Sequence, residues 1–365
     1  MLKVWFHVLK WDSSGGHMLK IGVVGGGHIA KHRHIPIFQK MKDVEVYAVC
    51  DSVESVAKNV AGRFGIKHYY TDLSEMLKAG LDIVDVTTPP QSHIFIAREA
   101  IEAGCHLLVE KPLAMTVKDV DEMYSLAKKH DVKLCVVHQN LYNPAVQKAV
   151  RLVREGVVGD LISVDVGTFV RRDNYMCVNG SHWCHKLLGG IFFEVLPHPV
   201  YLLQIFLKEA APKFVLAKKL SGFEWMKADE ARVLFGADNG IGLVVASCNS
   251  PFHGDALNIL GTKMGLQVDL WGRYVIKYKP RTEDPVSVGK GNLDLAFQFL
   301  GLLGTTASNA FTMGLGGEKV SAHYGFLRAF VDAVQGEGKL PVSEEEAREN
   351  VSIVEKICRM IDESV

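Results

Sequence analysis

The chain carries the stretch VVGGGHIA at residues 23–30, which leads from an apolar, strand-like run into a helix-like segment over residues 28–41. It fits the pattern G-x-G-x-x-G/A, with Gly25, Gly27 and Ala30 at the three fixed positions. In this pattern the first glycine permits a tight turn, the second lets the backbone approach a pyrophosphate, and the small third residue lets helix and strand pack closely. The start of the helix adds N–H groups and the positive end of its dipole. A dinucleotide is therefore expected to bind at Gly25, Gly27, His28 and Ile29.

The residue that selects the dinucleotide is Asp51, which ends the second strand-like run, 21 residues after Ala30. A carboxylate at this place accepts hydrogen bonds from the hydroxyls of the adenosine ribose and repels a 2′-phosphate. Ser52, Val53 and Glu54 follow it, so no arginine stands ready for such a phosphate. The sequence therefore predicts NAD rather than NADP. A glycine-rich turn without a ligand is the alternative interpretation.

The pattern of apolar runs around this turn predicts an α/β fold with two parts. From Leu19 to about Gln139, short strand-like runs alternate with helix-like segments, which is typical of a Rossmann, doubly wound parallel sheet. After Gln139, longer strand-like stretches follow with few helices between them, which indicates a mostly antiparallel sheet in an α+β domain. We expect the Rossmann domain at residues 18–140 and the α+β domain at residues 141–365.

Three segments stand outside this alternation. Residues 1–17 end in SSGGH before Met18 and resemble a cloning linker, so we interpret Met18 as the native start. Residues 280–318 are rich in glycine and weakly patterned, which predicts a long loop or an arm. Amphipathic helices are expected after it at residues 321–334 and 343–363.

Composition excludes several classes of protein. The 365 residues include 41 Lys+Arg and 41 Asp+Glu, so the chain lacks the basic excess that is usual in a nucleic-acid binder. No uninterrupted apolar run approaches the roughly 18 residues that a membrane span needs. The 7 cysteines are scattered rather than arranged as a disulfide framework, which predicts a reducing, cytoplasmic location.

Two further strand ends carry polar residues, TTPPQSH at residues 87–93 and EKP at residues 110–112. Ligands of doubly wound sheets bind beyond the carboxyl ends of the strands. A lysine between a carboxylate and a proline at such an end packs poorly, which favours a functional role for Lys111. The alternative is a solvated pair of Glu110 and Lys111.

Together, the glycine turn and the motifs at residues 87–93 and 110–112 resemble the Gfo/Idh/MocA family (glucose–fructose oxidoreductase, inositol dehydrogenase, rhizopine catabolism), over essentially residues 19–365. The resemblance implies an oxidoreductase that moves a hydride between NAD and a secondary alcohol or ketone of a sugar, cyclitol or sugar derivative. It also implies that Lys111 contacts the nicotinamide ribose and the substrate hydroxyl, and that Glu110 orients the lysine. The cofactor contacts implied at the strand ends are Thr87, Thr88, Pro89, His93, Glu110 and Lys111.

The stretch GGIFFEVLPH at residues 189–198 resembles a second motif of the family, in which a glycine-rich turn leads into a helix with Asp-x-x-x-His. Glu194 takes the place of the aspartate, and the spacing i, i+4 puts it on one helix face with His198. Leu196 replaces a glycine of the family pattern, and Asn143 replaces an arginine. These departures concern the substrate geometry more than the type of reaction.

The reaction needs a base that takes a hydroxyl proton while a hydride leaves the same carbon. We assign His198 as the main acid/base, because imidazole titrates near neutral pH. Lys111 is the second proton-handling group, and Glu194 is a hydroxyl ligand or supporting acid. Whether Lys111 or His198 is the true base stays open.

Residues 177–185, CVNGSHWCH, hold four side chains that could bind zinc, but their spacing matches no standard structural zinc pattern, so we expect no metal. We interpret the segment as a substrate-lining loop in which Trp183 stacks on a sugar face and His182 or His185 contacts hydroxyls. The substrate contacts expected overall are Lys111, Asn140, Trp183, His185, Glu194 and His198.

Two other functions stay open. Glycosidases of the same family use tightly bound NAD for transient oxidation, elimination and re-reduction. A non-catalytic, NAD-binding regulatory protein is the other alternative, against which the presence of both Lys111 and His198 argues. The resemblance also implies a homodimer or homotetramer formed through the open face of the second sheet. From the composition we expect no nucleic-acid or membrane partner.

Overall fold

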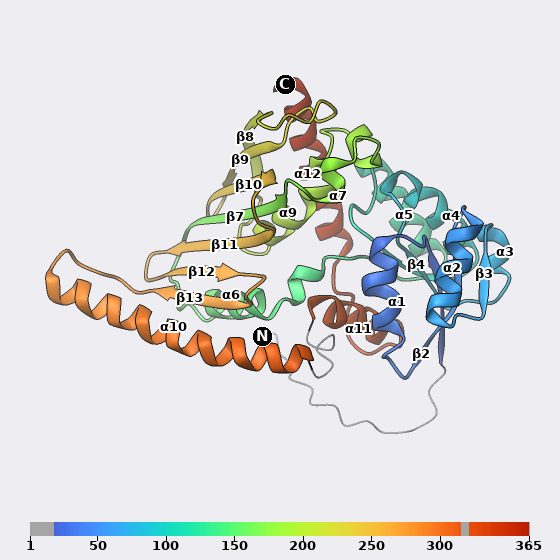
Figure 1. Ribbon diagram of the computed structural model, residues 1–365, viewed down its shortest axis with the longest axis horizontal. Helices are drawn as coiled ribbons and strands as arrows, with labels where there is room; N and C mark the ends of the chain where they lie inside the picture. Colours follow the sequence, from blue (N-terminus) through green and yellow to red (C-terminus); the bar gives the residue numbers. More distant parts are fainter. Residues whose placement is uncertain (1–17, 315–320, 365) are drawn as a thin grey trace.

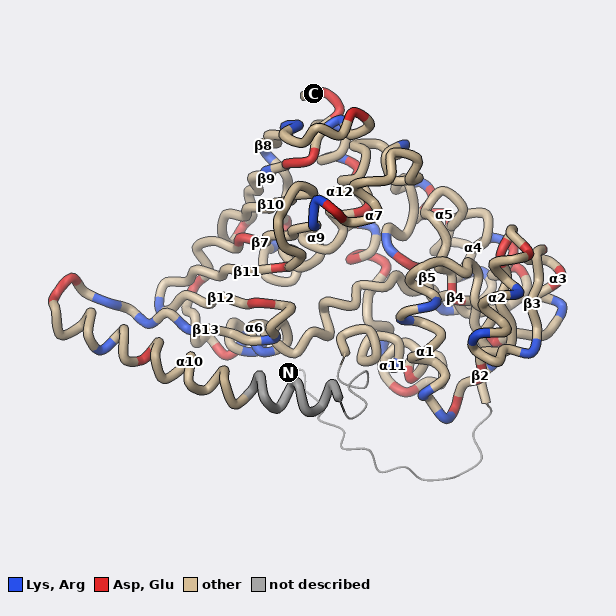
Figure 2. The backbone as a smooth tube through the Cα atoms, in the orientation of Figure 1, with Lys and Arg blue, Asp and Glu red and all other residues tan. Residues whose placement is uncertain are grey.

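The computed structural model describes residues 18–314 and 321–364, so the interpretation of residues 1–17 as a linker concerns a segment outside this part of the chain. Within it the chain forms two sheets, each with its own hydrophobic core (Figure 1). Acidic and basic residues are interspersed along both halves (Figure 2). No helix among the described residues combines the length and apolarity that crossing a membrane requires.

The first sheet has six parallel strands in the order β3-β2-β1-β4-β5-β6. The chain builds outward from β1 in one direction to β3 and then in the other direction to β6, so the switch point lies between β1 and β4. The prediction of a doubly wound parallel sheet is confirmed. The strands are β1 (Leu19–Val24), β2 (Val44–Cys50), β3 (His68–Tyr70), β4 (Ile83–Val86), β5 (His106–Val109) and β6 (Leu134–Val136).

Helices connect these strands, and their ends carry the expected signals. Thr116 accepts a hydrogen bond from the Asp119 N–H at the start of one helix, and Gly65 ends another with a φ of 66°. The helices of this half are α1 (Ile35–Phe38), α2 (Glu54–Phe64), α3 (Leu73–Leu77), α4 (His93–Glu102) and α5 (Val117–Lys129), with a short turn η2 (Pro90–Ser92) before α4.

The helix expected over residues 28–41 is not regular. It contains a π-helical segment, η1 (Ala30–His34), before α1, and the Ile35 N–H bonds to the Ala30 carbonyl five residues back. Such a wide turn accommodates an extra residue in the helix. His34 lies at the end of this segment, where its imidazole is fully buried and contacts two acidic side chains of the sheet.

The second sheet has seven strands in the order β13-β12-β11-β7-β10-β9-β8, in which only β7 and β10 pair in parallel. The expected mostly antiparallel sheet is therefore confirmed. Its strands are β7 (Leu161–Arg171), β8 (Ala211–Lys218), β9 (Glu230–Ala237), β10 (Gly240–Ser250), β11 (Gly254–Gly261), β12 (Gly265–Asp269) and β13 (Tyr274–Tyr278).

One face of this sheet is covered, and the other is open. Contacts with the sheet come from α6 (Pro144–Arg154), α9 (Pro197–Gln204) and α12 (Glu344–Ser364). Alternate residues on the opposite face leave large apolar side chains exposed, which is unusual for a sheet face that meets only water. They are Ile162, Phe214, Leu216, Leu234, Ile241 and Leu260.

The C-terminal helices connect the two halves. Phe326 and Phe330 of α11 (Ala322–Val334) belong to the core of the parallel sheet. The following α12 contacts α5 on one side and β8 and α9 on the other, so it runs between the halves (Figure 1). The chain thus returns to the first half near its end, while the domain boundary near residue 140 stays a proposal.

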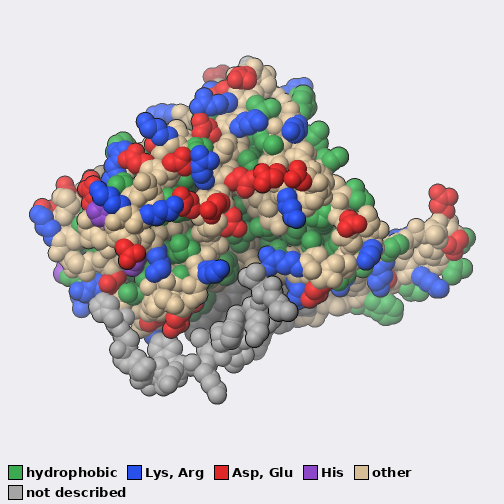
Figure 3. Space-filling model, turned by 180° about the vertical axis from the view of Figure 1, so that it is seen from behind, with side chains coloured by type: hydrophobic (Ala, Val, Ile, Leu, Met, Phe, Trp, Pro, Cys, Tyr) green, Lys and Arg blue, Asp and Glu red, His purple; other side chains and the backbone are tan. Residues whose placement is uncertain are grey.

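The sequence predicts a long loop or an arm at residues 280–318, and the described part of this region, residues 280–314, forms an arm that is largely helical. It contains a helix, α10 (Pro285–Gly314), that runs along β13 and projects beyond the sheet (Figure 1). Its apolar residues lie on several sides, since Leu293 and Leu295, two positions apart, point to nearly opposite sides of a helix, so the sequence lacks the one-sided period that identifies a helix. Figure 3 shows hydrophobic side chains along this arm.

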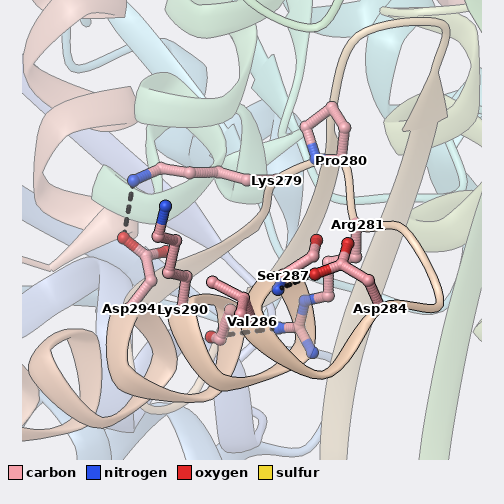
Figure 4. A pocket seen from close by; sticks show the side chains of 9 residues that line it. Lys279, Pro280, Arg281, Asp284, Val286, Ser287, Lys290 and Asp294 are labelled. Carbon is pink, nitrogen blue, oxygen red and sulfur yellow. Dashed lines mark hydrogen bonds and ion pairs between the residues drawn. The ribbon is translucent and has the colours of Figure 1, made fainter.

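Polar contacts attach α10 to the sheet edge. The Gln298 amide accepts a hydrogen bond from the Lys277 N–H at 2.8 Å and donates one to its carbonyl at 3.0 Å, which satisfies edge groups of β13. Lys279 pairs with Asp294 at 2.6 Å beside a pocket of about 420 Å³ (Figure 4). This pocket contains none of the residues with predicted roles in catalysis or binding.

Candidate active site

The glycine turn follows β1 at the switch point of the parallel sheet. Gly25 has a φ of 99°, and a Cβ there would lie 2.9 Å from the Thr87 carbonyl oxygen, so the fold itself requires a glycine. Gly27 is different, because a Cβ at this residue would meet nothing closer than the same oxygen at 4.0 Å. The packing of the chain itself therefore does not require a glycine at residue 27. A pyrophosphate lying against this backbone would require one, because a side chain would occupy its place. The turn thus fits a dinucleotide, followed by helical backbone at His28 and Ile29.

Asp51 is tied to this turn. One carboxylate oxygen accepts a hydrogen bond from the Gly26 N–H at 2.8 Å, and the other accepts one from the Val53 N–H at 2.9 Å. Each oxygen retains a lone pair, because a carboxylate offers about four acceptor positions. The side chain is partly exposed and stands beside the turn, so it is free to accept hydrogen bonds from a ribose.

The threonines after β4 hold the neighbouring strand end in place. The Thr87 hydroxyl donates toward the carbonyls of Val24 and Gly25, at 3.0 and 2.8 Å, and so joins the two strand ends. The Thr88 hydroxyl accepts a hydrogen bond from the Ser92 hydroxyl at 2.7 Å. Pro89 caps the short turn η2. Thr87 is buried, while Thr88 and Pro89 retain exposed surface at the rim of the predicted cofactor site.

The predicted cofactor contact of His93 requires a correction. The residue is fully buried, with Nε2 at 2.8 Å from the Thr88 carbonyl oxygen. Its Nδ1 faces the carbonyl oxygens of Pro112 and Leu113, each at 3.1 Å. His93 therefore joins the two strand-end loops from beneath, and no part of its ring is accessible to a cofactor.

A buried network beneath the EKP motif was missed in the sequence. His34 Nδ1 lies 2.9 Å from both Asp85 oxygens, and its Nε2 lies 3.0 Å from Glu110 Oε1. Burial opposes a charge on the ring, but the two carboxylates prevail and raise the pKa of His34 to about 10. The protonated ring then donates one hydrogen bond to each carboxylate. The signal available was Asp85 itself, an acid within the otherwise apolar strand β4.

This network orients Glu110 and, through it, the lysine. Glu110 Oε2 accepts a hydrogen bond from the Lys111 N–H at 3.1 Å, while Oε1 is held by His34. The orienting role that the resemblance implied for Glu110 therefore has a geometric basis. Because Glu110 is buried, unlike Asp51, this carboxylate acts on the backbone of Lys111 rather than on a ligand.

The amine of Lys111 reaches across to the second half of the molecule. Its Nζ donates to Glu194 Oε1 and, at 3.0 Å, to the Glu194 carbonyl oxygen. The other carboxylate oxygen, Oε2, is buried without a hydrogen-bond partner among the described residues. Burial raises the pKa of Glu194, although Lys111 opposes the shift. An unsatisfied acceptor beside a lysine at a strand end is a place where a substrate hydroxyl would bind.

Glu194 and His198 lie on two short helices rather than on the single helix expected. Glu194 is on α8 (Phe192–Val195) and His198 is on α9, with a break at Leu196. Pro197 and Pro199 lack the N–H groups that an uninterrupted helix would use. The backbone of Leu196 nonetheless stays in the right-handed helical region, at φ −66° and ψ −26°, so the direction of the chain is retained.

Tyr201, which the sequence does not single out, contacts His198. The Tyr201 hydroxyl lies 2.9 Å from His198 Nδ1, and it accepts a hydrogen bond from the Asn140 N–H at 3.2 Å. The His138 ring stacks on the Tyr201 ring, with centroids 4.2 Å apart. Asn140 belongs to the turn η3 (Gln139–Tyr142) that ends the first half. Burial, and then the nearby Lys111, lowers the pKa of His198.

The loop at residues 177–185 lies beside Glu194. Burial and then the Glu194 charge raise the pKa of the Cys184 thiol to about 12. His185 Nε2 lies 2.8 Å from the Met176 carbonyl oxygen, and its buried Nδ1 lacks a hydrogen-bond partner among the described residues. Trp183 is partly exposed on η4 (Trp183–Lys186). In the described ranges, no group of three side chains is arranged to bind a metal ion.

Comparison with known proteins agrees with this geometry. Residues 19–138 match the model of an oxidoreductase family with an NAD-binding Rossmann fold, GFO_IDH_MocA. D-glucoside 3-dehydrogenase of Escherichia coli is 33% identical over 144 residues, which cover 39% of this chain and 41% of that protein. D-apiose dehydrogenase of Paraburkholderia graminis is 31% identical over 142 residues, 38% of this chain and 37% of that protein. Oxidoreductase P35 of Formosa agariphila is 26% identical, and the match covers 50% of this chain and 58% of that protein.

Solved structures share the fold over nearly the whole chain. The WlbA dehydrogenase of Bordetella pertussis, solved with NADH and UDP-GlcNAcA, superposes with a TM-score of 0.76 at 20% identity, covering 96% of this chain and 97% of that one. A putative myo-inositol dehydrogenase of Sinorhizobium meliloti superposes with a TM-score of 0.73 at 16% identity, covering 95% and 98%. Residues 19–138 thus match the Rossmann part of the Gfo/Idh/MocA family of oxidoreductases, and the solved structures share the two-sheet fold of the whole chain.

Proposed function

We propose that this protein is an NAD-dependent dehydrogenase that interconverts a secondary alcohol and a ketone of a sugar, cyclitol or sugar derivative. The observation that carries the proposal is the contact between Lys111 and Glu194, at the carboxyl end of β5, in which one Glu194 oxygen has no hydrogen-bond partner among the described residues. A carboxylate and an amine held together in this way suit the binding and deprotonation of a hydroxyl. The relatives named for glucoside and apiose oxidation support a carbohydrate substrate.

The residues of the turn suit NAD. Gly25 and Gly27 would hold its pyrophosphate, and Asp51 would bind the adenosine ribose and disfavour the 2′-phosphate of NADP. When bound, the nicotinamide supplies the acceptor for a hydride. The strand-end residues Thr88 and Pro89 would line this site, and Glu110 would hold Lys111 in position against it.

The chemistry of the chain is then a proton transfer coupled to hydride loss. The Lys111–Glu194 pair would take the substrate O–H proton, and a bound nicotinamide would supply the acceptor for the hydride of the same carbon, which becomes a carbonyl. His198 contacts the same substrate oxygen from α9. Trp183, His185 and Asn140 would contact the rest of the substrate.

The experiment is a spectrophotometric assay of NADH formation with a panel of substrates. The panel contains free sugars, inositols, uronates, nucleotide sugars and aryl glycosides, and aglycone release is recorded in parallel. NADH formation that disappears in the double variant Lys111→Ala, His198→Ala, but not in a variant of the exposed Lys58, Lys58→Ala, would support the proposal. Aglycone release without NADH formation would indicate the glycosidase instead, and NAD binding without turnover on any substrate would indicate a binding protein.

We further propose an oligomer assembled through the open face of the seven-stranded sheet, in a reducing cytoplasm. The exposed apolar side chains on that face, such as Phe214 and Ile241, support the assembly. The 7 cysteines are all free and buried, which suits a reducing compartment. Light scattering on wild type and on a Phe214→Lys, Ile241→Lys variant measures the assembly, which is expected to be weaker in the variant.

A further inference from the structure

The hydroxyl of Tyr201 has two neighbours that restrict where its proton lies. Tyr201 is 3% exposed, so water has little access to it. Its oxygen lies 3.2 Å from the Asn140 nitrogen and 2.9 Å from His198 Nδ1, and these are its hydrogen-bond partners within the described part of the chain. The His138 ring stacks on one face of the tyrosine, and the His198 ring meets it edge-on at an angle of 80°. The phenol therefore has little freedom to rotate its polar end elsewhere.

Counting protons decides the direction of the hydrogen bond between Tyr201 and His198. The Asn140 N–H can only donate, so it uses a lone pair of the phenol oxygen. The single phenol proton then has one acceptor in reach, which is His198 Nδ1. If Nδ1 carried a proton instead, the phenol O–H would be left without an acceptor in a buried place, which is unfavourable. The arrangement thus requires a lone pair on Nδ1 and places the ring proton on Nε2.

The surroundings of His198 favour this neutral ring. Burial lowers its pKa, and the neighbouring groups Lys111, His138, His323 and His253 add to the effect. Burial also lowers the pKa of His138 and of His323 to about 3, so both rings are uncharged at neutral pH, and burial together with Lys111 is what disfavours a protonated His198 there. The phenol on the same element is held protonated by its own burial, which raises the pKa of Tyr201. At neutral pH the pair is therefore a neutral phenol and a neutral imidazole.

We propose that Tyr201 is a positioning residue that fixes His198 as the Nε2–H tautomer. His198 then donates a hydrogen bond to the substrate oxygen, and the Lys111–Glu194 pair takes the proton of the substrate hydroxyl. The ring nitrogen with the free electron pair is Nδ1, and the phenol already uses it. Glu194 Oε2, in contrast, is an acceptor without a partner in the part of the chain that the structure describes. This reverses the assignment of His198 as the main base. The catalytic part of the inference rests on the proposed dehydrogenase function, whereas the tautomer does not.

The tautomer is measured without any turnover. In full-length protein labelled with ¹⁵N-histidine, protonated and unprotonated ring nitrogens have well-separated ¹⁵N shifts, and the His198 signals are those missing from a His198→Gln variant. We expect a protonated Nε2 and an unprotonated Nδ1 in wild type, and a mixture of tautomers in Tyr201→Phe. Tyr124→Phe is the matched control, because Tyr124 is a buried tyrosine whose hydroxyl lacks a partner among the described residues. A protonated Nδ1 in wild type would overturn the proposal.

The role is measured by comparing two replacements of His198 on the substrate identified in the panel. Glutamine retains a neutral N–H donor but cannot take up a proton at neutral pH, whereas alanine retains neither property. If His198 only donates, kcat of His198→Gln stays within about tenfold of wild type, and His198→Ala loses distinctly more. If His198 is the base, both variants lose alike, by about 10²–10⁴-fold, and the proposal fails.

Tyr201→Phe separates positioning from folding. We expect kcat to fall while KM changes little, and the pH dependence of kcat to acquire a new ionisation, because His198 is no longer held in one tautomer. An unchanged pH profile would contradict the inference. A wild type that turns over no substrate would refute the proposed function alone, and the ¹⁵N measurement would then still decide the tautomer.

Discussion

Two buried polar groups lie at the carboxyl end of β5, and they differ in whether their hydrogen-bonding capacity is satisfied. In the first group, His34 bridges Asp85 and Glu110, and each ring nitrogen has a carboxylate within 3.0 Å. In the second group, which consists of Lys111 and Glu194, the lysine bonds to Glu194, but Glu194 Oε2 has no hydrogen-bond partner among the described residues. A satisfied buried network stabilises the fold, whereas an unsatisfied one retains capacity for a ligand.

The two groups also differ in where their members come from. The network of His34, Asp85 and Glu110 lies within the parallel-sheet half, on η1, β4 and the end of β5. The pair of Lys111 and Glu194 spans the two halves, so its geometry depends on how they pack. We therefore expect changes in the first group to act mainly on stability, and changes in the second to act mainly on catalysis.

The largest effect is expected for Lys111→Met. Turnover should fall by about 10²–10⁴-fold, because the variant loses a proton-handling group at the substrate oxygen. Stability should change little, because Glu194, whose pKa burial already raises, can take up a proton when its partner is removed. Steady-state kinetics and urea unfolding measure the two effects, with Lys58→Met as the control. A loss of less than tenfold in turnover would contradict the assignment of Lys111 as a proton-handling group.

The opposite pattern is expected for His34→Gln. Removing the imidazolium leaves the buried carboxylates of Asp85 and Glu110 without their shared cation. The free energy of unfolding should therefore fall by about 3–5 kcal/mol. Turnover per folded molecule should change much less than in Lys111→Met. The exposed neighbour His32, changed in His32→Gln, serves as the control. Equal stability of His34→Gln and wild type would show that the network is dispensable.

The network also predicts a dependence of stability on pH. The pKa of His34 rises from 6.5 to about 10 on folding, although burial opposes the increase. Stability from this group is therefore fully present below about pH 6.5 and is lost as the pH rises through about 10. Urea unfolding across this range should show a decline in wild type that is smaller in His34→Gln. Parallel curves for the two proteins would contradict a protonated His34.

The smallest effects distinguish the two glycines. Gly25→Ala should destabilise the fold by about 1–3 kcal/mol, because it combines a positive φ with a close backbone contact. Gly27→Ala should leave stability nearly unchanged, since the protein leaves room for a Cβ there, but it should weaken NAD binding. Thermal unfolding and fluorescence titration with NAD measure the pair. If Gly27→Ala bound NAD with unaltered affinity, the backbone at Gly27 would not be part of the NAD-binding site.

Much of the fold could be predicted from local patterns. The strand at residues 106–109 contains the apolar run 107–109 and ends with it, and the parallel and antiparallel halves follow from the lengths and alternation of such runs. The arm α10 could not be assigned as a helix, because its apolar residues lie on more than one side and give no single period. The candidate site was predicted only where its residues stand in one short motif, as in EKP.

The sequence by itself determined the glycine turn, the strand-end lysine and the alternation that makes a doubly wound sheet, since these depend on spacing within a few residues. Only the tertiary structure decided which groups meet. His34 lies 51 residues from Asp85, Lys111 lies 83 residues from Glu194, and the Asn140 backbone lies 61 residues from Tyr201. Such contacts depend on how distant parts of the chain pack together, and the periodicity of a short stretch of sequence does not predict this packing. That packing decides which carboxylate is satisfied and which ring nitrogen carries a proton.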